Sequence, residues 1–428
     1  MTRLIVFLND RDAVDAGRFG PKAANQAALG HAGLPIPDGF CLDAEAYCLQ
    51  LAALGVDGSA QQARSADTDT ARRLVAEVRL ALFEQPITPE VREPLLEAWR
   101  ALMERTDALT VVRSSALMED REGSSFAGQF ESFLGLETET DFLTAGRACW
   151  GALWSTRALR YMEGHNAHPA ETAMGVLVQP LVDAKASGGG MSITADGGMV
   201  VSGTWGLGSS LAQGEVVPDR YELSRDGQIG EILTGRKDHS VGCANLGEEP
   251  TTVAVVQERI SERCLDDAEV IELGAMLRQA EDLLGVPVEI EWALDDAGIK
   301  LLQARPLHME PAAVPDDIWL RHPGLKGHPA GIGWGTGPAC VINCECQLST
   351  VAPGDILITT VAGPALSQVL PRVAGVVAEL GGSTSHLASL ARERGIPMVL
   401  GVLNATTKIP EGRQVAVDGV AGVVRWMR

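Results

Sequence analysis

The segment VVAELGGSTSHLASLARERGIPMVLG, residues 376–401, has the pattern of a strand, a tight loop, a short helix and a second strand. The apolar run 373–380 ends at a pair of glycines, which suits a turn that most other residues cannot make. The hydroxyl side chains of residues 383–385 can cap a helix, and leucine and alanine then recur at helical spacing until Gly395. The pattern therefore predicts a helix whose first turn contains His386.

A histidine in the first turn of a helix is well placed to accept a phosphoryl group. Backbone N–H groups and the helix dipole favour an anion there, and a neutral imidazole, whose ordinary pKa is about 6.5, can attack phosphorus. An isolated histidine at such a position is more often a simple capping-region residue. The neighbours of His386 resemble the phosphohistidine signature of the phosphoenolpyruvate-utilising enzymes, the family that includes pyruvate phosphate dikinase: Gly381-Gly382, Thr384-Ser385-His386, Ala391-Arg392-Glu393 and Gly395-Ile396-Pro397. The resemblance implies that His386 carries phosphate between two active sites.

Composition limits the class of protein and its partners. A chain of 428 residues with 46% hydrophobic and 21% charged residues is typical of a globular protein with two or three domains. Acidic residues outnumber basic ones, 56 to 35, which argues against nucleic acid or an anionic membrane as the main partner. The apolar stretch at the N-terminus is too short for a signal peptide or a spanning helix, so we expect a cytoplasmic location.

The eight cysteines do not form a recognisable framework. They are too sparse for a disulfide scaffold, and a cytoplasmic protein is expected to keep them reduced. Cys340, Cys344 and Cys346 lie close together but lack the paired spacing of a zinc site. We interpret them as small apolar residues in and near a strand.

The N-terminal part begins with a predicted strand and a helix that starts at Lys22. The segment GPKAANQAALGHAGLPIPDGF, residues 20–40, resembles the opening of the family's nucleotide-binding domain. By this resemblance Lys22 contacts ATP phosphates, although a lysine without these neighbours would be interpreted as a surface residue. Residues 57–71 are expected to form a solvated loop or helix edge, and two amphipathic helices are predicted at 71–84 and 89–104.

Arg113 is expected to leave the end of the next strand, where its planar guanidinium can bind phosphate oxygens. Residues 124–129, SSFAGQ, are small and flexible enough to fold over a nucleotide. Both segments resemble the family's ATP-grasp domain, which implies that Arg113 and Gly128 bind ATP. Glu119 and Asp120 between them fit a charged loop.

The adenine and ribose sites are inferred from the same resemblance. A strand at 175–179 and the residues after it occupy the place of the adenine hinge in ATP-grasp folds, which implies that Gln179 and Leu181 contact the base. A hairpin is predicted within residues 190–203, around the turn sequence ADGG. Beyond it, the resemblance makes Glu215 a candidate for binding the ribose hydroxyls.

A metal site is expected in the segment VPVEIEWALDDAGIKLLQARPL, residues 286–307. Its two predicted strands place Glu289 and Glu291 on one face, and Gln303 and Arg305 on one face. If the strands pair, carboxylate and amide oxygens of the kind that bind Mg²⁺ converge with a guanidinium. The pattern alone fits equally a hairpin with its charges on a wet face. The family resemblance favours a site in which Glu289, Glu291 and Gln303 hold Mg²⁺ and Arg305 contacts phosphate.

The remaining sequence predicts a second, smaller domain. Strands are expected at 337–342, 355–359, 373–380, 398–401, 414–418 and 422–426, with helices near 363–370 and 385–394. The predicted fold class is α/β (α+β), and the family resemblance implies an ATP-grasp nucleotide-binding domain followed by a small swivelling phosphohistidine domain. Their expected limits are 1–310 and 331–428, with residues 311–330 as a linker.

The function that the resemblance implies is a dikinase-like phosphotransferase. Mg²⁺-ATP phosphorylates His386, AMP and phosphate leave, and the phosphoryl group passes to an acceptor, either a small molecule or an acceptor domain on another polypeptide. Lys22, Arg113, Arg305 and Mg²⁺ would supply positioning and charge neutralisation. The sequence shows no counterpart of the pyruvate-binding barrel of phosphoenolpyruvate-handling relatives, so the acceptor site is not identified. Two other functions fit the sequence: an ATP-grasp ligase that joins a carboxylate to an amine and releases ADP, and a non-catalytic phosphocarrier.

Overall fold

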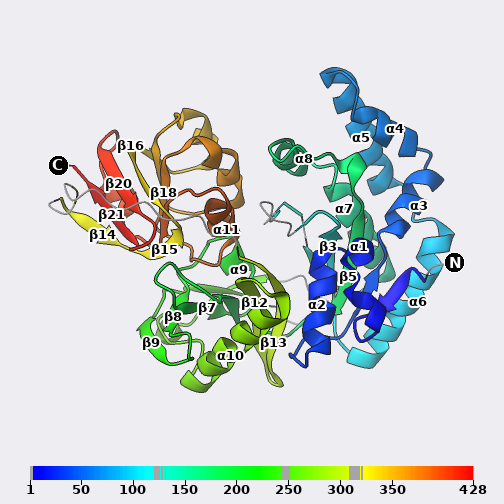
Figure 1. The fold of residues 1–428 in the computed structure, drawn as a ribbon, viewed down its shortest axis with the longest axis horizontal. Coiled ribbons are helices and arrows are strands. Elements are labelled where there is room, and N and C mark those ends of the chain that lie inside the picture. The colour runs from blue at the N-terminus through cyan, green and yellow to red at the C-terminus, as the bar shows by residue number, and fades with distance from the viewer. Residues whose placement is uncertain are drawn as a thin grey trace. The chain divides into compact units, whose positions relative to one another are not determined.

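The computed structural model describes residues 3–119, 126, 129–130, 132–242, 251–307, 319 and 322–427. The chain divides into two compact units. The first unit comprises Met1–Asp183, Cys243–Thr251 and Lys300–Arg305, and the second comprises Ala184–Gly242, Thr252–Ile299 and Pro306–Arg428. Figure 1 shows the helices and strands of both units, and each unit is described by itself below.

The first unit is built on an antiparallel five-stranded sheet in the order β1-β2-β5-β3-β4. Its strands are β1 (Ile5–Phe7), β2 (Phe40–Leu42), β3 (Thr110–Ala116), β4 (Ser132–Leu136) and β5 (Met174–Pro180). Its helices are α1 (Ala16–Phe19), α2 (Pro21–His31), α3 (Glu45–Ala53), α4 (Asp57–Ala63), α5 (Thr68–Glu84), α6 (Pro89–Thr106), α7 (Glu139–Ala152) and α8 (Thr156–Glu163). Two 3₁₀ turns complete it, η1 (Arg11–Val14) and η2 (Pro169–Glu171). Because β5 lies at the centre of the sheet, six of its seven residues are buried.

Most elements predicted for the first unit are confirmed, with two differences. Helix α4 occupies the first part of residues 57–71, which were expected to be a solvated loop or helix edge, because Ala60 and Ala63 give this polar segment a buried apolar edge. Strand β3 continues to Ala116, so Arg113 lies inside the strand and not beyond its end. The reason is that β3 pairs with β5 along its whole length, from Thr110 to Ala116.

The second unit contains two sheets, and we call residues 184–242 and 252–299 its central lobe. The lobe sheet has the strand order β13-β12-β6-β7-β8-β9. Its elements are β6 (Ala186–Met191), β7 (Met199–Trp205), β8 (Asp219–Leu223), β9 (Ile229–Leu233), β12 (Val288–Asp295), β13 (Gly298–Pro306), α9 (Ser209–Ala212), η3 (Gln257–Arg259), α10 (Asp267–Leu284) and a ribbon of β10 (His239–Gly242) with β11 (Thr251–Ala254). The predicted hairpin of β6 and β7 and the predicted strands β12 and β13 are confirmed.

The remaining part of the second unit, described from residue 322 to 427, we call the C-terminal domain. Its mixed sheet has the order β14-β21-β20-β16-β17-β18-β19-β15. The elements are β14 (Gly324–Lys326), β15 (His328–Gly331), β16 (Trp334–Ile342), η5 (Glu345–Thr350), β17 (Ile356–Thr359), η6 (Pro364–Gln368), η7 (Leu370–Arg372), β18 (Gly375–Ala378), α11 (His386–Glu393), β19 (Met398–Leu400), α12 (Ala405–Lys408), β20 (Gln414–Asp418) and β21 (Val423–Trp426). Every strand predicted for this part is confirmed.

Two expectations for the C-terminal domain are corrected. The helix predicted near 363–370 is a pair of 3₁₀ turns, each with a proline at its start, Pro364 and Pro371. The range predicted as a linker, 311–330, contains β14 and most of β15, which close the two edges of the sheet by pairing with β21 and β19. These two strands were not predicted, because the range is rich in proline and histidine and each strand is too short to show an alternating pattern.

The cysteines also depart from expectation at one place. Cys344 and Cys346 form a disulfide, with their Cα atoms 5.3 Å apart, although reduced thiols were expected. Cys340 is free and buried in β16, as a small apolar residue would be. Among the described residues no group of three or more His, Cys, Asp or Glu side chains is arranged to hold a metal ion.

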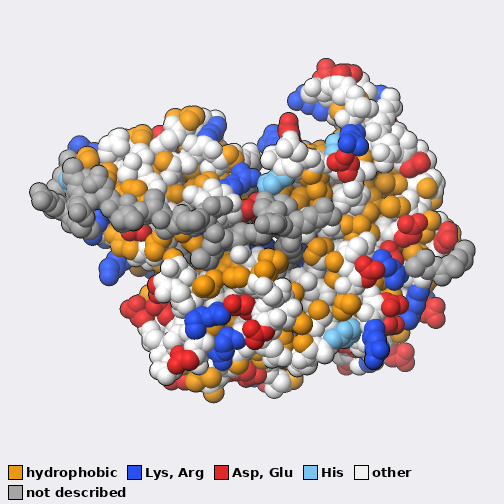
Figure 2. Space-filling model, in the orientation of Figure 1, with side chains coloured by type: hydrophobic (Ala, Val, Ile, Leu, Met, Phe, Trp, Pro, Cys, Tyr) orange, Lys and Arg blue, Asp and Glu red, His pale blue; other side chains and the backbone are white. Residues whose placement is uncertain are grey.

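Charged side chains of both signs are interspersed on the face shown in Figure 2. The formal charge of the whole chain is −21. None of the helices in the described part of the chain has both the length and the apolar character needed to cross a bilayer.

Candidate functional site

His386 is the first residue of α11, directly after the loop that leaves β18. Ser385 is the N-cap residue, and its side chain accepts a hydrogen bond from Ala388 N at 3.3 Å. Gly381 at the start of the loop has a φ of +103°, a conformation that residues with a Cβ rarely adopt. The imidazole is partly exposed. The structure therefore confirms the predicted position of His386 at a helix N-terminus.

The loop before α11 contacts the central lobe through backbone and side-chain atoms. Gly381 N donates to Val216 O at 3.0 Å, and Arg220 Nη1 donates to Ser383 Oγ at 3.4 Å. At the next residue the two segments touch, since a Cβ on Gly382 would lie 2.4 Å from Pro218 Cγ. Glycine is therefore required at residue 382 for this contact to form.

Helix α11 is fastened to the same lobe by Glu289 of β12. Ser389 Oγ donates to Glu289, with its two carboxylate oxygens at 3.2 and 2.9 Å, and Arg392 Nη2 donates to Glu289 Oε1 at 3.0 Å. The side chains of Arg392 and Glu289 are only 3% and 6% exposed. Arg392 also donates to Ala330 O at 3.0 Å and to Ser383 O, both within its own domain. Glu289 is thus part of a buried ion pair, and not on a wet face.

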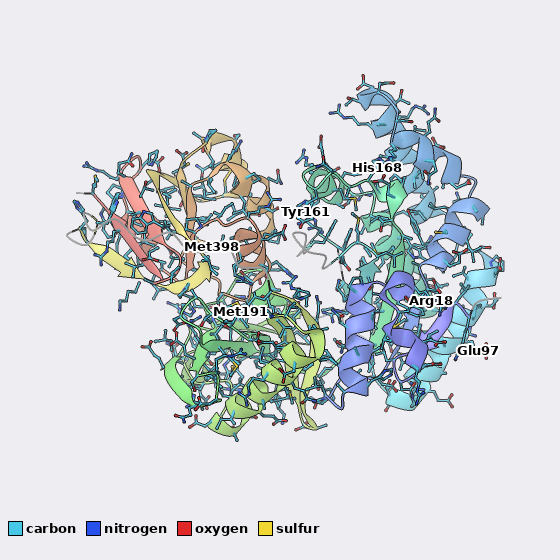
Figure 3. The ribbon with its side chains drawn as sticks, in the orientation of Figure 1. Arg18, Glu97, Tyr161, His168, Met191 and Met398 are labelled. Carbon is cyan, nitrogen blue, oxygen red and sulfur yellow. A yellow bond between two sulfur atoms is a disulfide. The ribbon has the colours of Figure 1, made fainter. Side chains whose placement is uncertain are left out.

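Glu291 lies on the sheet face that carries this contact. In the register of β12 and β6, Glu291 is opposite Gly189 and Glu289 is opposite Met191, the residue labelled in Figure 3. A Cβ on Gly189 would lie 2.8 Å from Thr384 Cβ, so this strand comes very close to the loop before His386. Residues directly opposite in an antiparallel pair point to the same face. Glu291 therefore emerges beside Thr384 and is partly exposed.

Asp219, the first residue of β8, forms a buried hydrogen-bond network in the lobe. Its carboxylate accepts hydrogen bonds from Gly235 N and Cys264 N, both at 2.8 Å, and from the Tyr221 hydroxyl at 3.2 Å. Lys237 Nζ binds the same carboxylate, and neither side chain of this pair is exposed at all. Because Asp219 follows Pro218, these bonds fix the turn that touches Gly382.

Two of the basic residues predicted to bind phosphate, Lys22 and Arg113, have protein partners in the first unit. Lys22 Nζ donates to Ser114 O at 2.8 Å and to Glu119 Oε1 at 3.3 Å. The second oxygen of Glu119 accepts from Ala116 N at 3.0 Å, so Glu119 is a buried partner of Lys22, and not part of a charged surface loop. Arg113 Nη1 donates to the backbone carbonyl of residue 302 at 2.6 Å.

At the predicted adenine hinge, two donors are already engaged. Gln179 Nε2 donates to Pro37 O at 3.1 Å, and Leu181 N donates to Leu109 O at 2.6 Å. The side chain of Gln179 is buried. A base bound at this strand would therefore contact groups other than the Gln179 side-chain amide and the Leu181 N–H.

The other predicted residues are placed as follows. Gln303 and Arg305 are buried near the end of β13, in a segment of the first unit. Glu215 belongs to the central lobe and is partly exposed, with its carboxylate 3.6 Å from the His239 ring. Gly128, like Asp120, lies outside the described residues. The second unit by itself therefore brings together His386, Glu289 and Glu291.

A cavity of about 860 Å³ lies between the central lobe and the C-terminal domain. Arg220, Arg392 and His328 are among the residues that line it. Burial, with a further contribution from the positive charge of Arg220, lowers the pKa of His328 to about 4. His328 is therefore neutral at pH 7, and its Nδ1 has no hydrogen-bond partner among the described residues.

The sequence alone did not identify the residues that join α11 to the lobe. Arg392 was part of the family motif and Ser389 lay in the predicted helix, both without a role, and their partner Glu289 was expected to bind metal. One signal was available, because the run Gly188-Gly189-Gly190 inside a strand indicates a close approach of another backbone.

Two known protein families match this chain. Residues 16–319 match the family described as pyruvate phosphate dikinase, AMP/ATP-binding domain, and residues 351–422 match the mobile domain of PEP-utilising enzymes. The chain thus combines an AMP/ATP-binding domain with a mobile domain that presents His386 at a helix N-terminus. It belongs to the family of phosphoenolpyruvate-utilising enzymes, which use ATP and Mg²⁺.

The similar curated proteins are longer than this chain. A probable phosphoenolpyruvate synthase of Methanothermobacter thermautotrophicus is 31% identical over 99% of this chain and 64% of its own length. The probable phosphoenolpyruvate synthase of Archaeoglobus fulgidus is 30% identical over 98% of this chain and 58% of its own length. Among solved structures, the D-alanine–D-alanine ligase of Coxiella burnetii is 10% identical over 67% of this chain and 46% of that chain, with a TM-score of 0.27. A TM-score this low leaves the family assignment resting on the sequence matches.

Proposed function

We propose that this chain is an ATP-dependent phosphotransferase of the dikinase type that works through a phosphohistidine at His386. One observation carries the proposal: His386 begins a helix that is seated on the face of the central lobe from which Glu289 and Glu291 emerge. A nucleophile at a helix N-terminus, on the side of the lobe that carries the partly exposed carboxylate of Glu291, suits phosphoryl transfer with Mg²⁺. The family match to an AMP/ATP-binding domain supports ATP as the donor.

The proposed reaction balances as two steps. In the first, ATP, water and His386 give AMP, inorganic phosphate and phosphohistidine; two phosphoanhydride P–O bonds of ATP break, one as the P–N bond to the imidazole forms and the other as water forms inorganic phosphate. In the second, the P–N bond breaks and an acceptor takes the phosphoryl group, which returns His386 to its free form. Lys22, Arg113 and Arg305 would bind the phosphate oxygens, because phosphoryl transfer needs positioning and neutralised charge more than covalent help.

The residues proposed for Mg²⁺ have suitable chemistry. Carboxylate and amide oxygens of the kind that Glu291 and Gln303 carry are ligands that Mg²⁺ accepts while keeping several waters. Glu291 is partly exposed and so has oxygen atoms accessible to a metal ion. Glu289 offers the same chemistry, but its carboxylate is already bonded to Ser389 and Arg392. Bound Mg²⁺ would screen the charge of the ATP phosphates.

The acceptor is a small molecule or a domain on another polypeptide. The two relatives named above are probable phosphoenolpyruvate synthases, so pyruvate is the first acceptor to test. This chain spans 64% and 58% of their lengths, so the similarity does not cover the rest of those proteins.

Labelled ATP tests the proposal directly. The protein is incubated with Mg²⁺ and ATP labelled at the β or the γ phosphate, and AMP and protein-bound label are measured. We expect AMP release and a protein phosphate that is labile in acid and stable in base, which His386→Ala abolishes. His31→Ala, at an exposed histidine in the first unit, is the matched control and should retain the label.

Other results would select a different function. Release of ADP without labelled protein, unaffected by His386→Ala, would indicate a carboxylate–amine ligase. Labelled His386 with no turnover on pyruvate or any other acceptor would indicate a phosphocarrier. Loss of label in His31→Ala as well would show that the assay reports folding and not the role of His386.

A further inference from the structure

The Glu289 side chain contacts two side chains of α11, those of Ser389 and Arg392. Both carboxylate oxygens lie within hydrogen-bond distance of Ser389 Oγ, and Oε1 also accepts from Arg392 Nη2. The three side chains are buried, at 3% to 6% exposure. A metal ion at Glu289 would have to displace the guanidinium, which is a charge-assisted partner in a site almost without water.

The three helix residues involved lie on one side of α11. Residues three apart on a helix are neighbours, so Ser389 lies beside both His386 and Arg392, and the three residues span an arc of about 120° around α11. Ser389 and Arg392 contact Glu289, and the loop residue Thr384 contacts Gly189. The bonds to Glu289 therefore set the rotation of α11 and present the His386 end of that face to the lobe.

Arg392 is held in position by its own domain. It donates to Ala330 O and to Ser383 O, and these bonds do not involve the central lobe. The guanidinium is thus oriented before docking, and its Nη2, which also donates to Ser389 Oγ at 3.0 Å, is the nitrogen that bonds to Glu289. When the C-terminal domain moves away, water can hydrate both charges, so that the penalty of an unpaired buried charge falls on the docked state alone.

We propose that Glu289 is a docking residue and not a metal ligand: with Ser389 and Arg392 it seats α11 on the central lobe so that His386 is positioned for phosphorylation. This inference rests on the proposed function, because the position of His386 matters for activity only if His386 is phosphorylated. The two carboxylates of β12 then have different roles. Glu289 binds the helix, while Glu291, two residues along the same face, is partly exposed and is proposed to bind Mg²⁺.

The test compares substitutions on both sides of the contact. Glu289→Gln removes the charge from the lobe, Ser389→Ala removes the hydroxyl from the helix, and Gly382→Ala places a methyl group against Pro218 without touching a charge. Glu291→Gln is the matched carboxylate control. Docking is measured by hydrogen exchange of the peptide that contains Gly381, whose N–H bonds to Val216 O only when the two parts are docked.

The first readout needs neither nucleotide nor metal. Removing a partner from a buried ion pair is a large effect, and glutamine retains an acceptor, so we expect Glu289→Gln to raise exchange at Gly381 by about 10- to 100-fold. Ser389→Ala and Gly382→Ala should raise it as well, while Glu291→Gln leaves it unchanged. Since these variants change different parts of the chain, failure of one to fold does not prevent the test.

The second readout is the rate of His386 labelling as a function of Mg²⁺ concentration. Glu289→Gln should slow labelling with the half-saturating Mg²⁺ concentration unchanged, and Glu291→Gln should raise that concentration. If Glu289→Gln shifts the Mg²⁺ requirement and leaves exchange at Gly381 as in the wild type, Glu289 is a metal ligand and the docking role is wrong. If the wild type never labels His386, the proposed function fails, but the exchange result still decides whether Glu289 docks the helix.

Discussion

Asp219→Asn should destabilise the central lobe more than Lys237→Met, although the two substitutions break the same ion pair. Both side chains are fully buried, but their remaining partners differ. Without Lys237, Asp219 keeps three donors: Gly235 N, Cys264 N and the Tyr221 hydroxyl. Without the Asp219 charge, Lys237 Nζ has no other acceptor within the described residues.

The magnitudes follow from this asymmetry. Removing one partner of a buried ion pair typically costs 3–5 kcal/mol, and the three donors left to Asp219 place Lys237→Met near the lower end, at about 3 kcal/mol. Asp219→Asn leaves the lysine without a counter-charge, at about 5 kcal/mol, and turns an amide donor toward a backbone N–H, which adds about 1–3 kcal/mol. The double variant removes both charges, so its loss should be smaller than the sum of the two single losses.

Native-state hydrogen exchange of β8, residues 219–223, measures this loss without assuming that a chain of two units unfolds in one step. Urea unfolding followed by tryptophan fluorescence gives a second value. Lys185→Met is the matched control, because Lys185 and Asp296 form the same type of pair with side chains 57% and 92% exposed. It should leave exchange in β8 unchanged.

Three results would refute the reasoning. Equal losses for the two single variants would show that the three donors do not stabilise the isolated carboxylate. Additive losses in the double variant would show that the buried charges do not act on each other. A loss in Lys185→Met as large as in Lys237→Met would show that burial is not the cause.

Two further predictions concern His328 and Lys22. The pKa of His328 is about 4 in the folded protein and about 6.5 when unfolded, so the unfolded chain binds the additional proton as pH falls through this interval. The wild type should therefore lose up to about 3 kcal/mol of unfolding free energy between pH 7 and pH 4 that His328→Gln does not lose, measured by urea unfolding at both pH values; parallel losses would contradict it. Lys22→Met should weaken ATP binding in a nucleotide titration and, because the buried Glu119 carboxylate loses its contact with the lysine, should lower the free energy of unfolding by about 1–3 kcal/mol. Unchanged ATP affinity would remove Lys22 from the phosphate site.

Local elements could be predicted because their signals are local. The glycine pair, the capping hydroxyls and Gly395 limit α11 within a few residues of their own positions. The alternation in residues 288–306 predicted β12 and β13 and placed Glu289 and Glu291 on one face. Where the local signal was weak, the prediction failed: α4 is a polar helix that depends on two buried alanines.

The partners of the charged residues could not be predicted, because they come from distant parts of the chain. Glu289 and Arg392 are separated by 103 residues, and Lys22 and Glu119 by 97. A period of two shows that Glu289 shares a face with Glu291, but it does not show what covers that face. Charge on such a strand is consistent with water, a metal ion or a second domain, and only the tertiary structure distinguishes these.

The glycines of β6 relate the local sequence pattern to a tertiary contact. A strand interior normally excludes glycine, because it contributes no side chain to packing. At Gly189 the missing side chain is the space that Thr384 occupies, two residues before His386. The same position lies opposite Glu291 in the sheet, so a side chain there would separate the loop from the carboxylate proposed to hold Mg²⁺. A locally unfavourable residue in β6 is therefore what lets the phosphohistidine loop approach the carboxylate face of the lobe.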